Sequence, residues 1–208
     1  MRASAQPSPA NASPRVQVLP FAGDDAELLA LLRRGGAAAA ALLHDRFAGD
    51  VHRVVARCLG PDADRDDVVH DAFVQILRGV GRVREAAGLR GWVVAVAANT
   101  ARSELRRRRF RRLFWSADPA PEPGVGDGDP EARDLLRRIY DHLDRMPTDE
   151  RIAFVLRHIE RHELTEVAKI VGCSLATAKR RIARASARFA ALATSDPELA
   201  RRFGGGAS

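Results

Sequence analysis

The sequence predicts an all-α protein built from two small helical domains that a flexible linker joins. Three observations carry this prediction. Apolar residues recur at the spacing of a helix stripe in two separate parts of the chain. No convincing stretch alternates between apolar and polar residues, as a half-buried strand would. Between the two parts, residues 118–130 read DPAPEPGVGDGDP, and so many prolines, glycines and acidic residues cannot form a packed element.

The domain boundaries follow from the composition along the chain. Residues 1–22 are rich in Pro, Ser and Ala without periodicity and are predicted to form a disordered leader. The first domain is expected over residues 24–115 and the linker over 116–130. The second domain is expected over 131–193, and residues 194–208 are expected to form a tail.

The first domain is predicted to contain three successive helical segments. Gly60 and Pro61 end the first segment. Acidic residues lie around the start of the second, where the helix dipole favours them, and two glycines loosen the chain after it. The third runs from about Leu89 to Arg112, apolar at its start and arginine-rich at its end. The apolar stripe of the second segment comprises Val68, Val69, Ala72, Phe73, Ile76 and Leu77.

The second domain is predicted to begin with an amphipathic helix over Asp134–Met146, which Pro147 ends. Thr148 is expected to cap the helix that follows. The apolar stripe of that helix comprises Val155, Leu156 and Ile159.

Residues 164–182 have the spacing of a helix-turn-helix. Ala168 is small where two helices must cross closely, Gly172 lies where the chain must turn, and Ser174 can cap the second helix. This recognition helix is expected over Leu175–Phe189. Its outward face predicts contact with the major groove or with phosphates. That face comprises Thr177, Lys179, Arg180, Arg181, Arg184 and Arg188.

The charge of the chain favours nucleic acid as a partner without proving it. Lys and Arg total 34 against 27 Asp and Glu, and only Lys169 and Lys179 are lysines. Arginine forks suit phosphates and guanine edges, although a GC-rich genome would also encode many arginines. The block Arg106–Arg109, with Arg102, Arg111 and Arg112, surrounds its helix and is expected to hold phosphates in a salt-dependent way.

Length and composition exclude several classes of protein. Among 208 residues, the longest apolar runs, Ala37–Leu43 and Trp92–Ala98, fall far short of the ~20 residues that span a bilayer. The start of the chain has no apolar segment typical of a secretory signal. Two cysteines, Cys58 and Cys173, are too few for a disulfide framework. We therefore expect a cytoplasmic protein without membrane insertion.

No catalytic or metal site is predicted. Asp66, Asp67, His70 and Asp71 share one exposed helix face, and with no second cluster to complete a site they favour protein docking over acid–base or metal chemistry. His158 and His162 stand four residues apart but have no obvious third metal ligand. The chain contains no phosphate-binding loop of the GxxxxGK[ST] type, and no cofactor is predicted.

Three segments together resemble the extracytoplasmic-function (ECF) sigma factors, the minimal two-domain transcription initiation factors of bacteria. DRDDVVHDAFVQILR (64–78) is similar to their region 2.2, and LRGWVVAVAANTARSELRRRR (89–109) is similar to regions 2.3 and 2.4. MPTDERIAFVLRHIE (146–160), with the helix-turn-helix after it, is similar to region 4. The resemblance covers residues 24 to 192 and implies a region 2 helical bundle and a region 4 helix-turn-helix domain.

The resemblance also implies partners and site residues. Asp67, His70, Asp71 and Gln75 would dock on the β′ clamp helices of core RNA polymerase, and region 4 would dock on the β flap. Asn99 would help to capture an unstacked base of the minus-ten element, in the loop Val80–Gly88. An anti-sigma factor would restrain the protein. Strand anchors would be Arg102, Arg106 and Arg107, and the residues for the minus-thirty-five element would be Thr177, Lys179, Arg180 and Arg184.

Two alternatives remain open from the residues alone. A stand-alone helix-turn-helix regulator would bind DNA without polymerase. A nucleic-acid-processing enzyme would use Asp66, Asp67, His70 and Asp71 around a metal, and its activity would depend on that metal.

Overall fold

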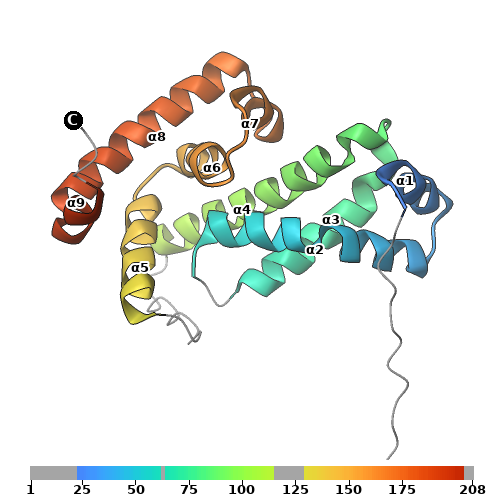
Figure 1. Cartoon of the computed structure of the whole chain (residues 1–208), viewed down its shortest axis with the longest axis horizontal. Helices are drawn as coiled ribbons and strands as arrows, with labels where there is room; N and C mark the ends of the chain where they lie inside the picture. The colour runs from blue at the N-terminus through green and yellow to red at the C-terminus, as the bar shows by residue number, and fades with distance from the viewer. Residues whose placement is uncertain (1–22, 62–63, 115–128, 204–208) are drawn as a thin grey trace, which may run out of the picture.

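The computed structural model describes residues 23–61, 64–114 and 129–203, and the regular elements in these ranges are helices (Figure 1). They form two helical domains, so the predicted all-α fold class is confirmed. The expected leader, most of the expected linker and the last five residues of the expected tail lie outside the described residues. Within the described part, no helix is both long and apolar enough to cross a membrane.

The N-terminal domain consists of α1 (Asp25–Arg34), α2 (Ala37–Leu59), α3 (Arg65–Gly79) and α4 (Leu89–Phe114). Helix α2 packs on both α3 and α4, and α3 packs on α4. The predicted stripe of α3 is buried except for Leu77, which is 41% exposed. Leu77 lies on the shoulder of the stripe, next to the solvent face, so its place in the core was predicted wrongly.

The C-terminal domain consists of α5 (Pro130–Asp144), α6 (Thr148–Phe154), α7 (Leu164–Ile170), α8 (Leu175–Ser195) and α9 (Pro197–Phe203). A wide helical turn, Val155–Ile159, continues α6. Helices α6 and α7 both pack on α8.

Several features of this domain differ from the prediction, and α8 continues to Ser195 instead of ending at Phe189. Helix α5 begins one turn early, because the Asp129 carboxylate accepts a hydrogen bond from the backbone of Glu131. Pro147, not Thr148, occupies the cap position of α6, and no side chain makes a capping hydrogen bond there. Helix α9 was not predicted. The Asp196 carboxylate caps it by accepting hydrogen bonds from two backbone amides at its start.

The two domains pack against each other, with α4 lying along α6 and α7 (Figure 1). Arg151 of α6 is 2% exposed and donates to the backbone carbonyls of Cys58 at 2.9 Å and Leu59 at 3.0 Å. The Tyr140 hydroxyl donates to the carbonyl of Arg57 at 3.0 Å. Buried apolar residues of both domains form one continuous core, and these hydrogen bonds lie beside it.

An ion-pair cluster reinforces this contact between the domains. The buried Glu160 carboxylate of the C-terminal domain pairs with Arg53 at 3.2 Å and with Arg57 at 2.5 Å, both from α2. Partial burial makes such charged hydrogen bonds stronger than surface pairs. Asp50 of α2 binds Arg53 and Arg90, and these bonds hold the pKa of its carboxyl below the usual value although burial alone would raise it.

Candidate nucleic-acid interface

The helix-turn-helix of α7 and α8 has the predicted turn. Gly172 has φ 64°, a left-handed conformation that favours glycine, and the amide of Cys173 donates back to the carbonyl of Ala168 at 3.0 Å. The Ser174 hydroxyl caps α8 by accepting from the amide of Thr177 at 3.2 Å. The predicted glycine turn and serine cap are thus confirmed.

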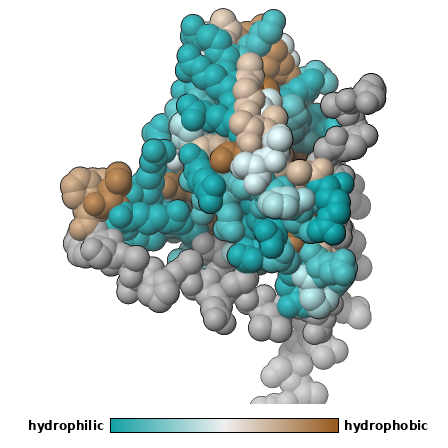
Figure 2. All heavy atoms as spheres, turned by 90° about the vertical axis from the view of Figure 1, so that its left-hand side faces the viewer, coloured by the Kyte–Doolittle hydropathy of each residue, from teal (hydrophilic) through white to brown (hydrophobic). Residues whose placement is uncertain are grey.

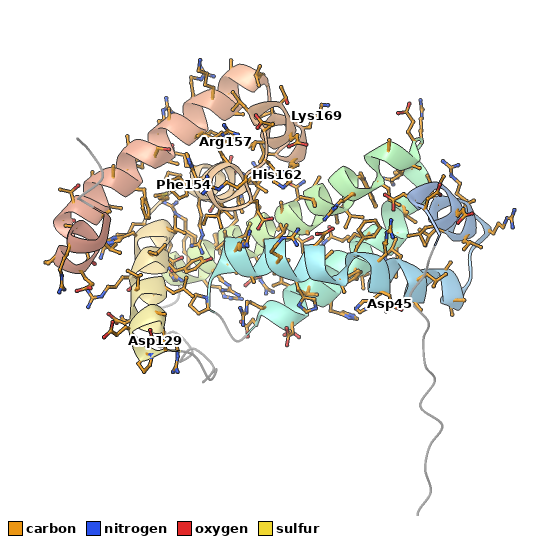
Figure 3. The ribbon with its side chains drawn as sticks, viewed as in Figure 1. Asp45, Asp129, Phe154, Arg157, His162 and Lys169 are labelled. Atoms are coloured by element: carbon orange, nitrogen blue, oxygen red, sulfur yellow. The ribbon has the colours of Figure 1, made fainter. Side chains whose placement is uncertain are left out.

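The turn before α7 is also fixed. Arg157 donates to the backbone carbonyl of His162 at 2.9 Å, which closes the chain between α6 and α7 (Figure 3). The Phe154 ring packs 5.1 Å from the Phe189 ring of α8, measured between ring centroids. His158 instead contacts Ser186 at 3.0 Å, so the structure does not join His158 and His162 into a metal pair.

The outward face of α8 is narrower than predicted. Lys179, Arg180 and Arg184 are exposed along it. Thr177 is half-buried, and its hydroxyl contacts Ser174 at 2.9 Å, so it belongs partly to the helix cap. Arg181 was expected on this face, but it turns inward and pairs with Asp149 at 2.9 Å.

The last residue expected on the outward face is also engaged. Arg188 pairs with the largely buried Glu150 at 3.0 Å. Both inward pairs reach the first turn of α6, because α8 packs directly on that helix. The free basic face of α8 therefore lies near its N-terminal end.

The acidic face of α3 is open to solvent. Asp67, His70, Asp71 and Gln75 are all exposed, on the side of the helix opposite its buried stripe. Among the described residues, no group of three or more His, Cys, Asp or Glu side chains gathers as a metal site would. This face is suited to a protein surface with complementary charge.

Helix α4 carries the residues expected to bind the minus-ten strand, and several of them contact the other domain. The Asn99 side-chain amide donates to the carbonyl of Ile170 at 3.3 Å, although part of Asn99 remains exposed. Arg102 and Arg106 both pair with the Asp149 carboxylate, at 2.7 Å and 2.8 Å. Asn99, Arg102 and Arg106 thus all point toward the C-terminal domain, and their hydrogen-bond donors bind protein groups.

Asp149 is the centre of this arrangement. Its carboxylate forms ion pairs with Arg102 and Arg106 of α4 and with Arg181 of α8. Burial alone would raise the pKa of this carboxyl, but the hydrogen bond from Arg102 and the charges of three arginines hold it below the usual value. The sequence did not single out Asp149 as a site residue. Its partners lie 32 to 47 residues away, so no local pattern marks it.

Three further arginines of α4 gather around one buried acid. Glu104, 6% exposed, pairs with Arg107 at 2.6 Å, Arg108 at 2.7 Å and Arg111 at 3.5 Å. Arg107 is still 65% exposed at its side chain and faces solvent. One carboxylate offsets only part of this charge, so the end of α4 stays strongly basic.

The same end of α4 presents exposed apolar side chains, with Phe110 56% exposed, Leu113 73% and Phe114 68%. The two phenylalanine rings stack with centroids 4.4 Å apart. Figure 2 shows the face of the molecule at this end, where hydrophilic areas alternate with apolar patches.

Comparisons with known proteins agree with this architecture. Residues 43–111 match the family model Sigma-70 region 2, and residues 136–189 match Sigma-70, region 4. The RNA polymerase sigma factor CnrH of Cupriavidus metallidurans is 30% identical over 154 residues, which cover 69% of this chain and 81% of CnrH. The ECF RNA polymerase sigma factor SigM of Mycobacterium tuberculosis is 29% identical over 168 residues, which cover 81% of this chain and 84% of SigM.

The fold is likewise similar to solved structures. CnrH in complex with the cytosolic domain of CnrY superposes with a TM-score of 0.59 at 25% identity, covering 83% of this chain and 98% of that one. The sigma factor RpoE of Bartonella quintana, in complex with the anti-sigma factor NepR, has a TM-score of 0.58 at 19% identity, covering 74% and 98%, and shares the fold. Both halves of the chain match in the same order, and so the chain belongs to the ECF family of RNA polymerase sigma factors.

Proposed function

We propose that this protein binds core RNA polymerase and directs it to a specific set of promoters, where it opens the DNA and starts transcription. The observation that carries the proposal is the combination of three surfaces in one chain. These are the acidic face of α3, the arginine-rich helix α4 and the basic face of the helix-turn-helix. A stand-alone regulator would need only the last of them.

The α3 face is the proposed polymerase contact. Asp67, His70, Asp71 and Gln75 would dock on the β′ clamp helices, and the C-terminal domain would dock on the β flap. All four side chains are exposed and available for such a contact.

The DNA contacts are proposed on α4 and α8. Asn99 would capture an unstacked base of the minus-ten element, while Arg102, Arg106 and Arg107 hold the strand backbone. Lys179, Arg180 and Arg184, with Thr177, would read or anchor the minus-thirty-five element in the major groove.

This function requires no catalysis by the chain itself. Trapping unstacked bases lowers the free energy of the opened DNA, so binding energy drives melting. We further propose that the protein acts in the cytoplasm and that an anti-sigma factor restrains it. The solved relatives support this last point, because RpoE was solved with the anti-sigma factor NepR.

The deciding experiment is co-elution of the full chain with bacterial core RNA polymerase at moderate salt. Stoichiometric co-elution is expected, and the double variant Asp67→Ala/Asp71→Ala should weaken it. The matched control is Asp45→Ala/Asp141→Ala, which removes two exposed acids from other helices; Asp45 lies on α2 (Figure 3). Absence of co-elution, with duplex DNA binding intact, would favour the stand-alone regulator instead.

A further inference from the structure

The loop that connects α3 to α4 is built from two short 3-10 turns and an extended joint between them. The turns are Val80–Arg82 and Ala86–Gly88. Each closes on itself, since the amide of Val83 donates to the carbonyl of Val80 at 3.0 Å and the amide of Gly88 donates to that of Glu85 at 3.1 Å. The joint comprises residues 83–85, and the backbones of Val83 and Glu85 are extended.

Arg33, from the last turn of α1, bonds this joint across 50 residues of sequence. Its Nη2 donates to the carbonyl of Val83 at 2.8 Å and to that of Arg84 at 3.1 Å. Neither turn uses these two carbonyls in its own closing bond. A guanidinium that bridges consecutive carbonyls fixes their relative orientation, and with it the angle between the two turns.

Helix α1 is a firm support for this contact. The Asp24 carboxylate caps it by accepting from the amides of Ala26 and Glu27. Leu28 and Leu29 are buried in the core, and Arg46 of α2 binds Asp25 at 3.0 Å. The guanidinium of Arg33 is thus presented from an element that is anchored at its start and along its length.

The first turn of the loop is held at its base by close packing. A Cβ on Gly79 would lie 2.9 Å from the Trp92 ring, so glycine lets the ring approach the backbone. Val80 and Val83 are buried, at 5% and 8% exposed. The second turn has no buried residue of its own, and Gly88 and Ala87 are exposed. Its position depends on its packing against α1 and α4 and on the joint that Arg33 holds.

We infer that Arg33 is a positioning residue for base discrimination at the minus-ten element. This inference rests on the proposed function, in which the loop Val80–Gly88 holds the base that Asn99 captures. Arg33 touches no base itself. It sets the geometry of the exposed residues of the loop by fixing the joint.

The test compares Arg33→Ala with Arg34→Ala, which removes the same charge from the exposed neighbouring position. Holoenzyme assembled from core polymerase and each full-length variant would be challenged with a promoter library randomised over the minus-ten element. The bound fraction would then be sequenced. The preference at the most selective base should fall roughly tenfold in Arg33→Ala, as expected for the loss of charged hydrogen bonds. Co-elution with core polymerase should be unchanged, and Arg34→Ala should behave as wild type.

A second measurement reports on the loop without DNA. Amide hydrogen exchange of the free chain should accelerate at Val83 and Gly88 in Arg33→Ala, while α3 keeps its protection. Arg33→Lys, which retains a charged donor, should restore part of the base preference and preserve the fold. Unchanged preference in Arg33→Ala, or an equal loss in Arg34→Ala, would overturn the inference. Wild-type holoenzyme without any minus-ten preference would instead refute the proposed role of the loop, and the inference with it.

Discussion

Replacing Asp149 with asparagine would remove the negative charge that three arginines share between the domains. Two of these, Arg102 and Arg106, are proposed strand anchors, and the same domain contact engages Asn99 through the carbonyl of Ile170. Binding of a minus-ten strand by the free chain must break these ties. Breaking these contacts costs free energy, and this cost weakens the binding of the strand.

The magnitude follows from the burial of each pair. The side chains of Asp149 and Arg102 are 23% and 19% exposed, so their bond is worth about 1.5–3 kcal/mol, as for other charged hydrogen bonds. Arg106 is 57% exposed and adds little because solvent screens it. Asparagine still accepts a neutral hydrogen bond, which leaves a net loss of about 1–2 kcal/mol. The affinity of the free chain for the strand should then rise by roughly 5- to 30-fold.

The assay is fluorescence anisotropy of a labelled single-stranded minus-ten oligonucleotide between 50 and 200 mM salt, a range over which phosphate contacts are resolved. Both proteins place the same arginines on the strand once it is bound, so the slope of log affinity against log salt should be similar, while the affinity of Asp149→Asn should be higher throughout the range. Asp134→Asn is the control, because Asp134 also pairs with two arginines, but on α5. Equal or weaker binding by Asp149→Asn, or an equal gain in Asp134→Asn, would refute the reasoning.

Three further outcomes can be checked on the purified chain. The folded pKa of Asp149 lies below the usual value of a carboxyl, so its stabilising effect is present above that usual value and is lost as pH falls through the folded pKa. The difference in melting temperature between wild type and Asp149→Asn should accordingly be present at pH 5 and shrink at pH 3. Gly60→Ala should lower the free energy of unfolding by about 2 kcal/mol or more in urea titrations, because φ at Gly60 is 87° and the new Cβ would lie 2.5 Å from the Tyr140 ring. Gly35→Ala should lower it by less, because φ there is 80° but no atom lies near the new Cβ. At pH 8 a thiol reagent should modify Cys173 in the native protein but Cys58 only after unfolding, since burial raises the pKa of Cys58 to about 12; rapid labelling of both thiols would contradict this.

Local patterns predicted the helix-turn-helix and most helices, although the N-terminal domain has four helices where three segments were predicted, because Gly35 and Gly36 separate α1 from α2. The Gly172 turn and the Ser174 cap depend on neighbours within a few residues, so the sequence displays them directly. Helix α9 was missed although Asp196 followed by Pro197 is a helix-start signal, because seven residues carry too little periodicity. The polymerase contacts and the assignment to particular promoter elements came from the family resemblance, whereas DNA contact by α8 and the arginine block came from the residues themselves. All of these roles stay predictions.

The contact between the domains could not be predicted from the sequence. Arg181 has the spacing of an outward-facing residue on an isolated helix, and only the packing of α8 against α6 reveals an acid that attracts it. In the same way, nothing near Glu160 in sequence indicates its partners Arg53 and Arg57, which are more than 100 residues away. Ion pairs of this kind depend on the tertiary arrangement, and no periodic sequence pattern indicates them.

The end of α2 illustrates how each domain completes the other. The last carbonyls of a helix have no partner within it, and those of Cys58 and Leu59 receive theirs from Arg151, a side chain of the other domain. Helix α2 is thus C-capped in trans by the second domain. When the domains separate, these two carbonyls lose Arg151 and bind water instead. Fraying of the last turn of α2 would therefore indicate that the domains have separated. Because water replaces the lost bonds, the uncapping itself adds only a small share to the free energy of separating the domains.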